Sequence, residues 1–396
     1  MNEYIELAEK SLIHTYNRYQ IVLDKGAGTN LYDINGKKYL DFTAGIAVFA
    51  LGYGNKDYND ALKDQVDKLI HTSNLFYSVP MAMAADKLKK ASWMDKVFFT
   101  NSGTEAIEGA IKVARKYMYL KGEKNRYEMI AMNHSFHGRS TGALAVTGTK
   151  AYREPFEPLM TGVKFAEFNN LESVKDLVNE KTCAIIMEPV QGEGGIFPAT
   201  KEFIEGIRSI CDKKDILLIF DEIQCGMGRC GSMFTFQEYG VKPDVLTTAK
   251  ALGCGVPVGA FLTSGKVSEV LKAGDHGTTY GGNPLACAAV SKVFDLFEQN
   301  KIIEHVKEVT PYFEEKLDAL VEKYECIKER RGKGFMQGLE FTIPVADIIK
   351  AVIDAGVIVI SAGSQVIRFV PPLIVEKKEI DEMIEILDRV LDSRKG

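Results

Sequence analysis

The sequence lacks the cysteine patterns that mark disulfide-rich domains and zinc sites. Its seven cysteines are an odd number, and none belongs to a CxxC pair or to a Cys/His spacing typical of metal binding. Both classes are therefore excluded, a reducing compartment fits best, and we expect no bound metal.

Long apolar runs, an export signal and an excess of one charge are missing as well. No run approaches the roughly 18 apolar residues of a membrane helix, and the N-terminus has no basic segment ahead of an apolar one. The 49 Lys and Arg nearly balance the 54 Asp and Glu, and no basic block is present. We therefore expect a cytoplasmic protein with neither a membrane nor a nucleic acid as partner.

The length and apolar content that are present suffice for two domains. The chain has 396 residues, of which 46% are hydrophobic, so it can fill two cores. No repeat or low-complexity tract marks a boundary, so we divide the chain by the type of element expected. We expect an N-terminal segment at 1–55 that packs with the smaller domain, a large domain at 56–285 and a small C-terminal domain at 286–396.

Short apolar runs alternate with helical patterns in the expected large domain. The runs are at 97–99, 129–132, 184–187, 216–220 and 245–246. Continuous apolar runs between helices are typical of a mostly parallel sheet covered by helices. The large domain is therefore expected to be α/β.

The two ends of the chain have other patterns. Asn35 and Gly36 tolerate the positive φ of a tight turn and predict a hairpin over 31–42. Near the C-terminus, charged helices surround β-rich stretches at 357–360 and 366–370. The chain finishes with a helix whose apolar face carries Ile380, Met383, Ile384, Leu387, Val390 and Leu391. These features predict a smaller α+β domain.

Two polar residues stand out where apolar runs end, because ligands of open α/β sheets collect at the carboxyl ends of strands. Lys250 has no charged neighbour between 245 and 263, and such a desolvated amine can attack an aldehyde. Asp221 directly follows 216–220 and needs a cationic or hydrogen-bonding partner there. A solvated surface lysine and a carboxylate that caps a turn are the alternatives.

Two further strand ends carry small, aromatic or cationic residues. Residues 100–106 lead into a helix that is expected to have Ala106, Ala110, Ala114 and Met118 on one face. They offer hydroxyls and glycine at its N-terminus, which suits a phosphate, although an ordinary helix cap has the same pattern. Phe136 and Arg139 follow 129–132 and offer a ring face and a fixed cation, with plain core packing as the alternative for Phe136. We interpret His137 between them as a structural hydrogen-bonding residue.

A G-x-G-x-x-G match at 226–231 does not indicate a dinucleotide site. That fingerprint should begin at the end of a strand and open a helix. Here residues 221–225 intervene and no helix start follows. We assign these glycines to an irregular loop and exclude a dehydrogenase.

Taken together, the sequence resembles the subgroup III aminotransferases of fold type I, which use pyridoxal 5'-phosphate. The similarity spans most of the chain, and its motifs are NSGTEA (101–106), FHGR (136–139), EPVQGEGG (188–195), DEIQCGMGRCG (221–231), AKALG (249–253) and GGNPLACAA (281–289). Cys225 and Cys230, where the family commonly has threonine, and Ile107, where many members have asparagine, depart from the pattern. None of the three removes a catalytic group.

The resemblance implies roles for the residues near the cofactor ring. Lys250 would hold the cofactor as a Schiff base and then move the proton during transfer. Asp221 would keep the ring nitrogen protonated, which makes the ring an electron sink. Gln224 would donate to the phenolic oxygen of the ring, and Phe136 would stack on its face.

The resemblance also implies how the phosphate is held. Gly103 and Thr104 would bind it within one chain, and Thr279 would reach it across a dimer interface. A homodimer with shared active sites is therefore the expected minimum unit.

For the substrates, the resemblance implies an amine donor and 2-oxoglutarate as partners. Arg139, with Thr278 nearby, would bind the carboxylate of N2-acetyl-L-ornithine, and Tyr16 would help line that pocket. Arg368 would bind the α-carboxylate of glutamate and 2-oxoglutarate, and Glu193 would pair with Arg368 when glutamate is absent. An outward-facing charge is the alternative for Arg368, but its neighbours are apolar.

The implied reaction moves the terminal amino group of N2-acetyl-L-ornithine to 2-oxoglutarate, a step of arginine biosynthesis. Related ω-aminotransferases for ornithine, 4-aminobutyrate or succinyl-diaminopimelate are the alternatives, and an aminomutase is disfavoured by the Arg368 and Glu193 pair. A non-catalytic regulator that binds pyridoxal phosphate would need a DNA-binding segment, which the sequence does not offer.

Overall fold

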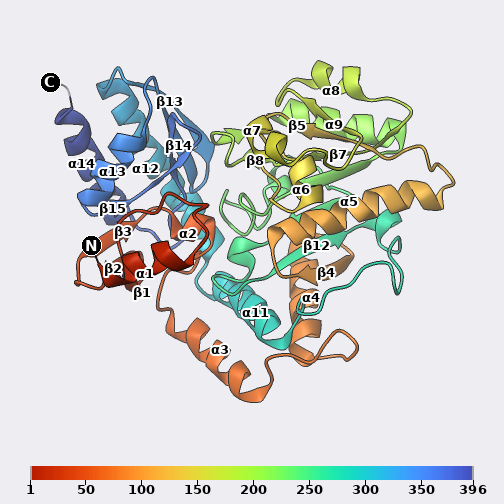
Figure 1. Cartoon of the computed structure of the whole chain (residues 1–396), viewed down its shortest axis with the longest axis horizontal. Coiled ribbons are helices and arrows are strands. Elements are labelled where there is room, and N and C mark those ends of the chain that lie inside the picture. The colour runs from red at the N-terminus through yellow and green to blue at the C-terminus, as the bar shows by residue number, and fades with distance from the viewer. Residues whose placement is uncertain (1, 395–396) are drawn as a thin grey trace.

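A seven-stranded sheet lies at the centre of the larger of two lobes (Figure 1) in the computed structural model, which describes residues 2–394. Its strand order is β4 (Lys96–Thr100), β12 (Gly259–Thr263), β11 (Val245–Thr248), β10 (Leu217–Asp221), β7 (Thr182–Met187), β5 (Glu128–Met132) and β6 (Val163–Ala166). Among these described strands, β12 alone runs in the direction opposite to the others. The expected mostly parallel sheet and its five strand runs are confirmed.

Two strands of this sheet were not expected. Strand β6 lies at the sheet edge and includes the half-buried Lys164, so its apolar run is broken. Strand β12 begins with glycine soon after Pro257, two residue types that usually interrupt strands. The pairing of β12 with both β4 and β11 overrides that local signal.

Helices pack against the sheet through faces of small and aliphatic residues. Helix α5 (Gly103–Leu120) packs on β11 and β12, and α9 (Lys201–Lys214) packs on β7 and β10. The predicted α5 face is confirmed, since it buries Ala106, Ala110, Ala114 and Met118. Ser102 caps this helix, as its Oγ accepts from the Glu105 N–H at 3.3 Å.

The smaller lobe joins the two ends of the chain (Figure 1). One sheet has the order β1 (Leu23–Ala27), β2 (Asn30–Asp33), β3 (Lys38–Asp41) and β15 (Val357–Ile358). The other has the order β13 (Ile327–Lys333), β14 (Met336–Phe341), β17 (Val366–Phe369) and β16 (Ile360–Ala362). The predicted hairpin is confirmed, with Gly36 at φ +82° in its turn.

The stretch expected at 357–360 is divided between these two sheets. Its first part forms β15, which runs parallel to β3, and its last residue begins β16, which pairs with β17. Apolar content predicts that such residues form strands, but their partners are set by residues far away in the sequence.

Helices complete the smaller lobe. Helix α12 (Ile302–Lys323) packs against α14 (Lys377–Asp392), and α13 (Ala346–Asp354) lies against α14 and β15. The predicted C-terminal helix is confirmed: five of its six expected apolar residues are buried and Ile384 is half-buried.

The domain boundaries stay a prediction. The pairing of β3 with β15 supports the placement of 1–55 with the smaller domain. Helix α11 (Pro284–Gln299) spans the expected boundary at 286, and it packs mainly against α3 (Lys56–Lys68) and α4 (Val79–Ser92). We therefore propose that the second domain begins after α11.

The remaining elements are short. They are α1 (Glu3–Ser11), α2 (Ala44–Ala47), α6 (Thr141–Ala145), α7 (Lys150–Arg153), η1 (Glu154–Phe156), α8 (Leu171–Leu177), β8 (Val190–Gln191), β9 (Phe197–Pro198), α10 (Phe236–Tyr239), η2 (Lys250–Leu252) and η3 (Gly265–Val267). Residues 226–231 form the irregular loop expected there. Within 2–394, no helix is long and apolar enough to cross a membrane.

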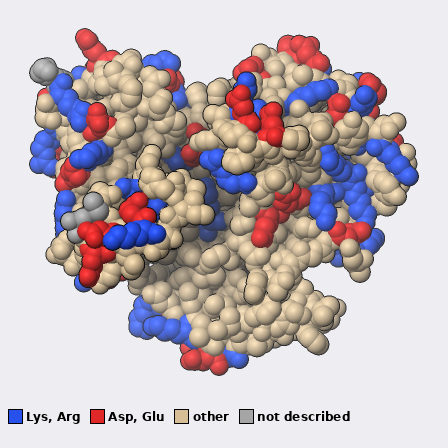
Figure 2. All heavy atoms as spheres, viewed as in Figure 1, with Lys and Arg blue, Asp and Glu red and all other residues tan. Residues whose placement is uncertain are grey.

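One exposed surface, formed by the segment that leads into α4, is apolar. Leu75 and Tyr77 are 89% and 99% exposed. Tyr280 adjoins them, because its ring lies 5.3 Å from the ring of His71 in the same segment. In Figure 2 the surface over α4 and α11, low in the view, has few charged side chains. We call Leu75, Phe76, Tyr77, Val79 and Tyr280 the apolar surface.

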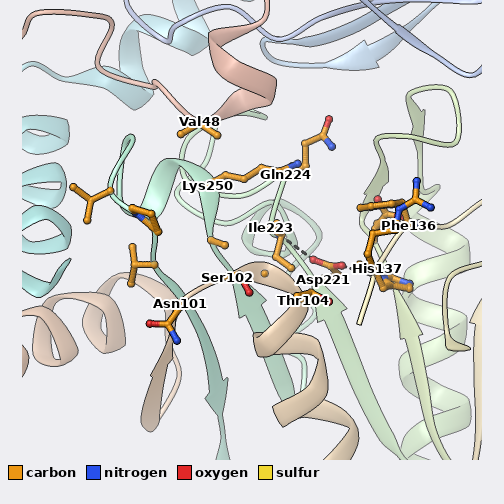
Figure 3. A pocket seen from close by; sticks show the side chains of 18 of the residues that line it. Val48, Asn101, Ser102, Thr104, Phe136, His137, Asp221, Ile223, Gln224 and Lys250 are labelled. Atoms are coloured by element: carbon orange, nitrogen blue, oxygen red, sulfur yellow. Dashed lines mark hydrogen bonds and ion pairs between the residues drawn. The ribbon is translucent and has the colours of Figure 1, made fainter. Parts of the chain in front are cut away.

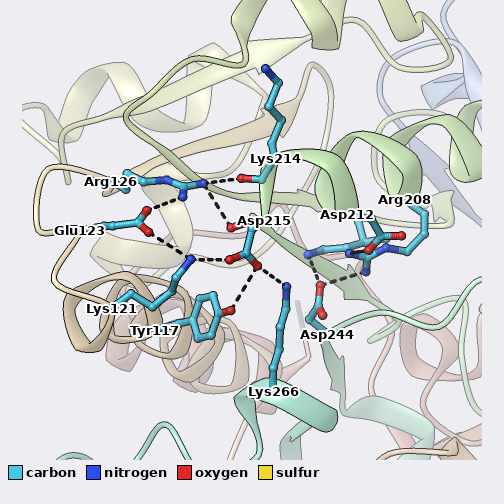
Figure 4. A network of polar contacts seen from close by, with 11 residues as sticks. Tyr117, Lys121, Glu123, Arg126, Arg208, Asp212, Lys214, Asp215, Asp244 and Lys266 are labelled. Atoms are coloured by element: carbon cyan, nitrogen blue, oxygen red, sulfur yellow. Dashed lines mark hydrogen bonds and ion pairs between the residues drawn. The ribbon is translucent and has the colours of Figure 1, made fainter.

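A polar network at the amino ends of the strands ties helices together on the side away from Asp221 (Figure 4). Asp215, just after α9, accepts from Lys266 Nζ at 2.8 Å and from the Tyr117 hydroxyl at 3.2 Å, and also pairs with Lys121. The two ammonium groups, Lys121 first, hold the pKa of the Asp215 carboxyl well below its usual range. The network therefore lies at the amino ends of the strands, whereas a ligand site is expected at their carboxyl ends.

Candidate active site

A cavity of about 470 Å³ opens at the carboxyl ends of β4, β5, β10 and β11. Figure 3 shows side chains from these strand ends around the same hollow. The expected site residues that line it are Gly103, Thr104, Phe136, Arg139, Asp221, Gln224 and Lys250. These residues come from four separate parts of the sequence, and they meet at one cavity because each part lies at the carboxyl end of a strand.

Lys250 follows β11 after one intervening residue, Ala249, and projects into the cavity (Figure 3). Burial, and then the cation of Arg368, lower the pKa of its ammonium to about 8. A larger fraction of this amine is thus neutral and nucleophilic near pH 7 than in an ordinary lysine. Its backbone lies at φ +50°, an uncommon conformation for a residue other than glycine and one that tends to occur at functional sites.

Asp221 ends β10 and has the partners that a buried carboxylate requires. His137 Nδ1 lies 2.7 Å from Asp221 Oδ2, while the Thr247 hydroxyl and the Ile223 N–H donate to Oδ1 at 3.2 and 3.0 Å. Burial lowers the pKa of His137, but the hydrogen bond to Asp221 and the carboxylates of Asp221 and Glu188 outweigh it and raise that pKa. These three hydrogen bonds hold the carboxyl group of Asp221 in place at the end of β10.

Sequence reasoning gave no role to Glu188, which also lines the cavity. Its Oε2 accepts from the Phe136 N–H at 3.1 Å, and its Oε1 accepts from the Gly192 N–H at 3.2 Å. Burial raises the pKa of Glu188 to about 7. Glu188 directly follows β7, and Asp221 is the last residue of β10, so the same strand-end signal could have found Glu188.

The N-terminus of α5 forms the end of the cavity suited to a phosphate. Gly103 packs so closely on Ile223 that a Cβ there would lie 2.8 Å from its side chain. The Thr104 hydroxyl accepts from the Ser140 N–H at 3.1 Å and bonds the Ser140 hydroxyl at 2.8 Å. Free N–H groups and the helix dipole favour an anion at this position.

Arg368 reaches the cavity wall from the smaller lobe. It lies on β17 between two neighbouring strands and is only 3% exposed, which excludes an outward-facing charge. Its Nη1 lies 3.0 Å from Glu193 Oε2 and donates to Gln224 Oε1 at 3.1 Å. The structure thus forms the expected pair of Arg368 and Glu193 beside a residue that lines the cavity.

Besides Arg368 and Glu193, which lie behind Gln224, three expected residues do not line the cavity of this single chain. Thr278 accepts through its Oγ1 from Asn101 Nδ2 at 3.3 Å, so it lies just behind the wall. Thr279 is exposed and borders a separate small depression next to His71. Tyr16 is 70% exposed.

The cavity meets the chemical needs of pyridoxal 5'-phosphate. It offers an amine of lowered pKa for the aldehyde, a carboxylate for the ring nitrogen, an aromatic face for the ring and a helix N-terminus for the phosphate. Fold and site together define a pyridoxal-phosphate enzyme with an α/β large domain.

The chain belongs to the class-III aminotransferases, since the model of that family matches residues 13–391. It is 48% identical to an acetylornithine aminotransferase of Methanocaldococcus jannaschii over 98% of this chain and 97% of the relative. It is 46% identical to one of Clostridium acetobutylicum over 96% and 99%. The chain is therefore a pyridoxal-phosphate-dependent transaminase.

Solved structures have the same fold over nearly the whole chain. The N-acetylornithine aminotransferase of Stenotrophomonas maltophilia superposes with a TM-score of 0.85 at 34% identity, covering 98% of this chain and 99% of that one. An ornithine aminotransferase of Toxoplasma gondii reaches a TM-score of 0.95 at 28% identity, covering 99% and 95%. The predicted fold type I architecture is confirmed.

Proposed function

We propose that this chain transfers the terminal amino group of N2-acetyl-L-ornithine to 2-oxoglutarate, giving N-acetylglutamate 5-semialdehyde and glutamate in arginine biosynthesis. The observation that carries the proposal is the pair of Arg368 and Glu193, which lies next to Gln224 of a cavity whose lining includes Arg139. Two separate cations suit an enzyme that must accept two differently placed carboxylates. The names and the 41–48% identity of several full-length relatives support this substrate.

Four residues would carry the chemistry at the cofactor. When bound, pyridoxal phosphate supplies the aldehyde that takes up the amino group and a ring that withdraws electrons. Lys250 Nζ would hold the cofactor and, once released, move the proton between substrate and cofactor. Asp221 would keep the ring nitrogen protonated while Phe136 stacks on the ring. Gln224 Oε1 accepts from Arg368, which leaves its Nε2 to donate to the phenolic oxygen.

The substrate carboxylates would be bound by different arginines in the two half-reactions. Arg139, with Thr278 and Tyr16 nearby, would bind the carboxylate of N-acetylornithine. Arg368 would bind the α-carboxylate of glutamate after Glu193 moves aside. While Glu193 occupies Arg368, the cation is neutralised and does not compete for the carboxylate of the other substrate.

The two arginines give a test of this proposal. We expect Arg368→Ala to slow the half-reaction with glutamate by about thirtyfold to several thousandfold, because losing a buried charged contact costs about 2 to 5 kcal/mol. The half-reaction with N-acetylornithine should stay near the wild-type rate. Stopped-flow absorbance of the cofactor in single turnovers measures each half separately.

Arg139→Ala is the matched control for that experiment. It should chiefly slow the half-reaction with N-acetylornithine, with a smaller loss for glutamate through its distal carboxylate. Equal slowing of both halves by Arg368→Ala would mean that Arg368 is structural and that Glu193 is no gate.

A homodimer with shared active sites is part of the proposal. The apolar surface includes Tyr280, the residue after Thr279, so a second copy of this chain that covers this surface would also cover Thr279. Gly103 and Thr104 would hold the phosphate from one chain, and Thr279 would reach it from the partner. Its position outside the cavity of its own chain supports this arrangement.

The dimer can be tested with a charge placed in the apolar surface. We expect Tyr77→Asp to halve the molar mass measured by light scattering at micromolar concentration, because an unpaired charge would be buried at the interface. Tyr119→Asp is the control, since Tyr119 is an exposed tyrosine too, at 56%, but lies near the end of α5 and is not part of the apolar surface. If light scattering gave the wild-type protein the molar mass of a single subunit, the shared active site would be refuted.

Other partners stay predictions. The sequence predicts a cytoplasmic location and neither nucleic acid nor membrane as partner, in line with its balanced charge.

A further inference from the structure

The guanidinium of Arg139 lies against two aromatic rings, those of Tyr152 and Phe136. Its Cζ lies 3.8 Å from the centroid of the Tyr152 ring and 5.5 Å from that of Phe136. The two rings meet edge to face, with centroids 6.2 Å apart and planes at 89°. Tyr152 lies on the short helix α7, outside every motif that indicated the site.

The guanidinium edge of Arg139 is open within the part of the chain that the structure describes. Among residues 2–394, no hydrogen bond or ion pair to its guanidinium is found. Arg331 gives a contrast, because it stacks on Phe197 at the same 3.8 Å but binds the Gly195 carbonyl and Glu340 through its N–H groups. The guanidinium of Arg331 is contacted at its flat face and at its N–H edge, whereas the guanidinium of Arg139 is contacted only at its flat face.

Such stacking fixes the direction of the free edge. An arginine has several rotatable bonds, and ordering them when a ligand binds costs free energy. A ring against the flat face restricts the rotation while the planar fork of N–H donors stays open for a carboxylate. The distance identifies Tyr152 as the closer of the two rings.

We propose that Tyr152 is a positioning residue for the amine substrate: its ring orients Arg139 so that the guanidinium fork meets the substrate carboxylate. This inference rests on the proposed function, in which Arg139 binds that carboxylate. The ring face makes the contact, and no hydrogen bond of the Tyr152 hydroxyl is found among the described residues. Phenylalanine should therefore replace Tyr152 without loss.

The test compares Tyr152→Leu and Tyr152→Phe with the wild-type enzyme loaded with cofactor. For N-acetylornithine we expect Tyr152→Leu to raise KM by about threefold to tenfold with kcat nearly unchanged, the size typical of a cation–π contact. Tyr152→Phe should keep the wild-type KM. For N-acetylputrescine, the same amine without a carboxylate, kcat/KM should be equal in all three proteins.

Two further measurements separate positioning from general disturbance. Tyr127→Leu removes a ring from another arginine, Arg115, with its Cζ 5.9 Å from the ring centroid, and should leave both substrates unaffected. In the Arg139→Ala background, Tyr152→Leu should cause no additional loss with N-acetylornithine, because the residue it orients is gone.

The outcomes are distinguishable. An unchanged KM in Tyr152→Leu, or an equal loss with N-acetylputrescine, would overturn the role of Tyr152. If the wild-type enzyme itself failed to discriminate between the two amines, the proposed substrate would be wrong and the inference would fall with it.

Discussion

Replacing Lys250 with alanine is expected to abolish the yellow colour of the purified enzyme and to reduce transamination by about a thousandfold or more. Among residues 2–394, Lys250 is the only lysine that lines the cavity, and burial lowers its pKa to about 8. Without its amine, the protein loses both the covalent attachment of the cofactor and the group that moves the proton. Absorbance spectra and steady-state rates with N-acetylornithine and 2-oxoglutarate measure the two losses.

A chemical label checks the same assignment independently. Borohydride reduction of the wild-type enzyme followed by peptide mapping should mark Lys250. The control Lys213→Ala changes an exposed lysine of α9 and should keep colour and rate. A label on any other lysine would contradict the assignment.

Asp221→Asn is expected to bind the cofactor yet transaminate about a hundredfold to ten-thousandfold more slowly. A neutral amide cannot hold the proton on the ring nitrogen, so the ring withdraws electrons poorly. The hydrogen bonds of His137 and Thr247 would still order the side chain, which keeps the defect chemical. Stopped-flow measurement of proton abstraction from the substrate reports the loss, and a near-normal rate would refute the role of Asp221.

Glu222→Gln is the matched control for Asp221→Asn. Glu222 is the next residue, does not line the cavity, and accepts from the Thr235 and Phe236 N–H groups. Burial raises the pKa of the Glu222 carboxyl to about 8, which favours its neutral form. The folded fraction of the Glu222→Gln protein should transaminate at nearly the wild-type rate.

Local patterns were sufficient to predict the core of the large domain and the centre of the site. Buried parallel strands are apolar along their whole length, so five of the seven were visible, and the residues that follow them indicated Lys250 and Asp221. The face of α5 was equally clear, because its small residues recur with the period of a helix.

Features that depend on distant partners were not visible from such patterns. Strand β12 begins with a glycine and owes its place to pairing on both sides, and β15 and β16 separate within one apolar stretch. Arg368 became a site candidate only through the family resemblance, because it lies in the other lobe. Tyr152 had no signal at all, since a tyrosine on a short helix looks like any surface aromatic.

The parallel pairing of β3 with β15 has a consequence for synthesis of the protein. The first strands of the smaller lobe leave the ribosome roughly 300 residues before their partner at Val357 and Ile358. Until then the edge of β3 is unpaired, and such an edge can pair wrongly with another chain. The order of translation thus delays closure of this lobe until the sheet that positions Lys250 has already been made, and the nascent N-terminal hairpin is the part of the chain that a chaperone would need to shield.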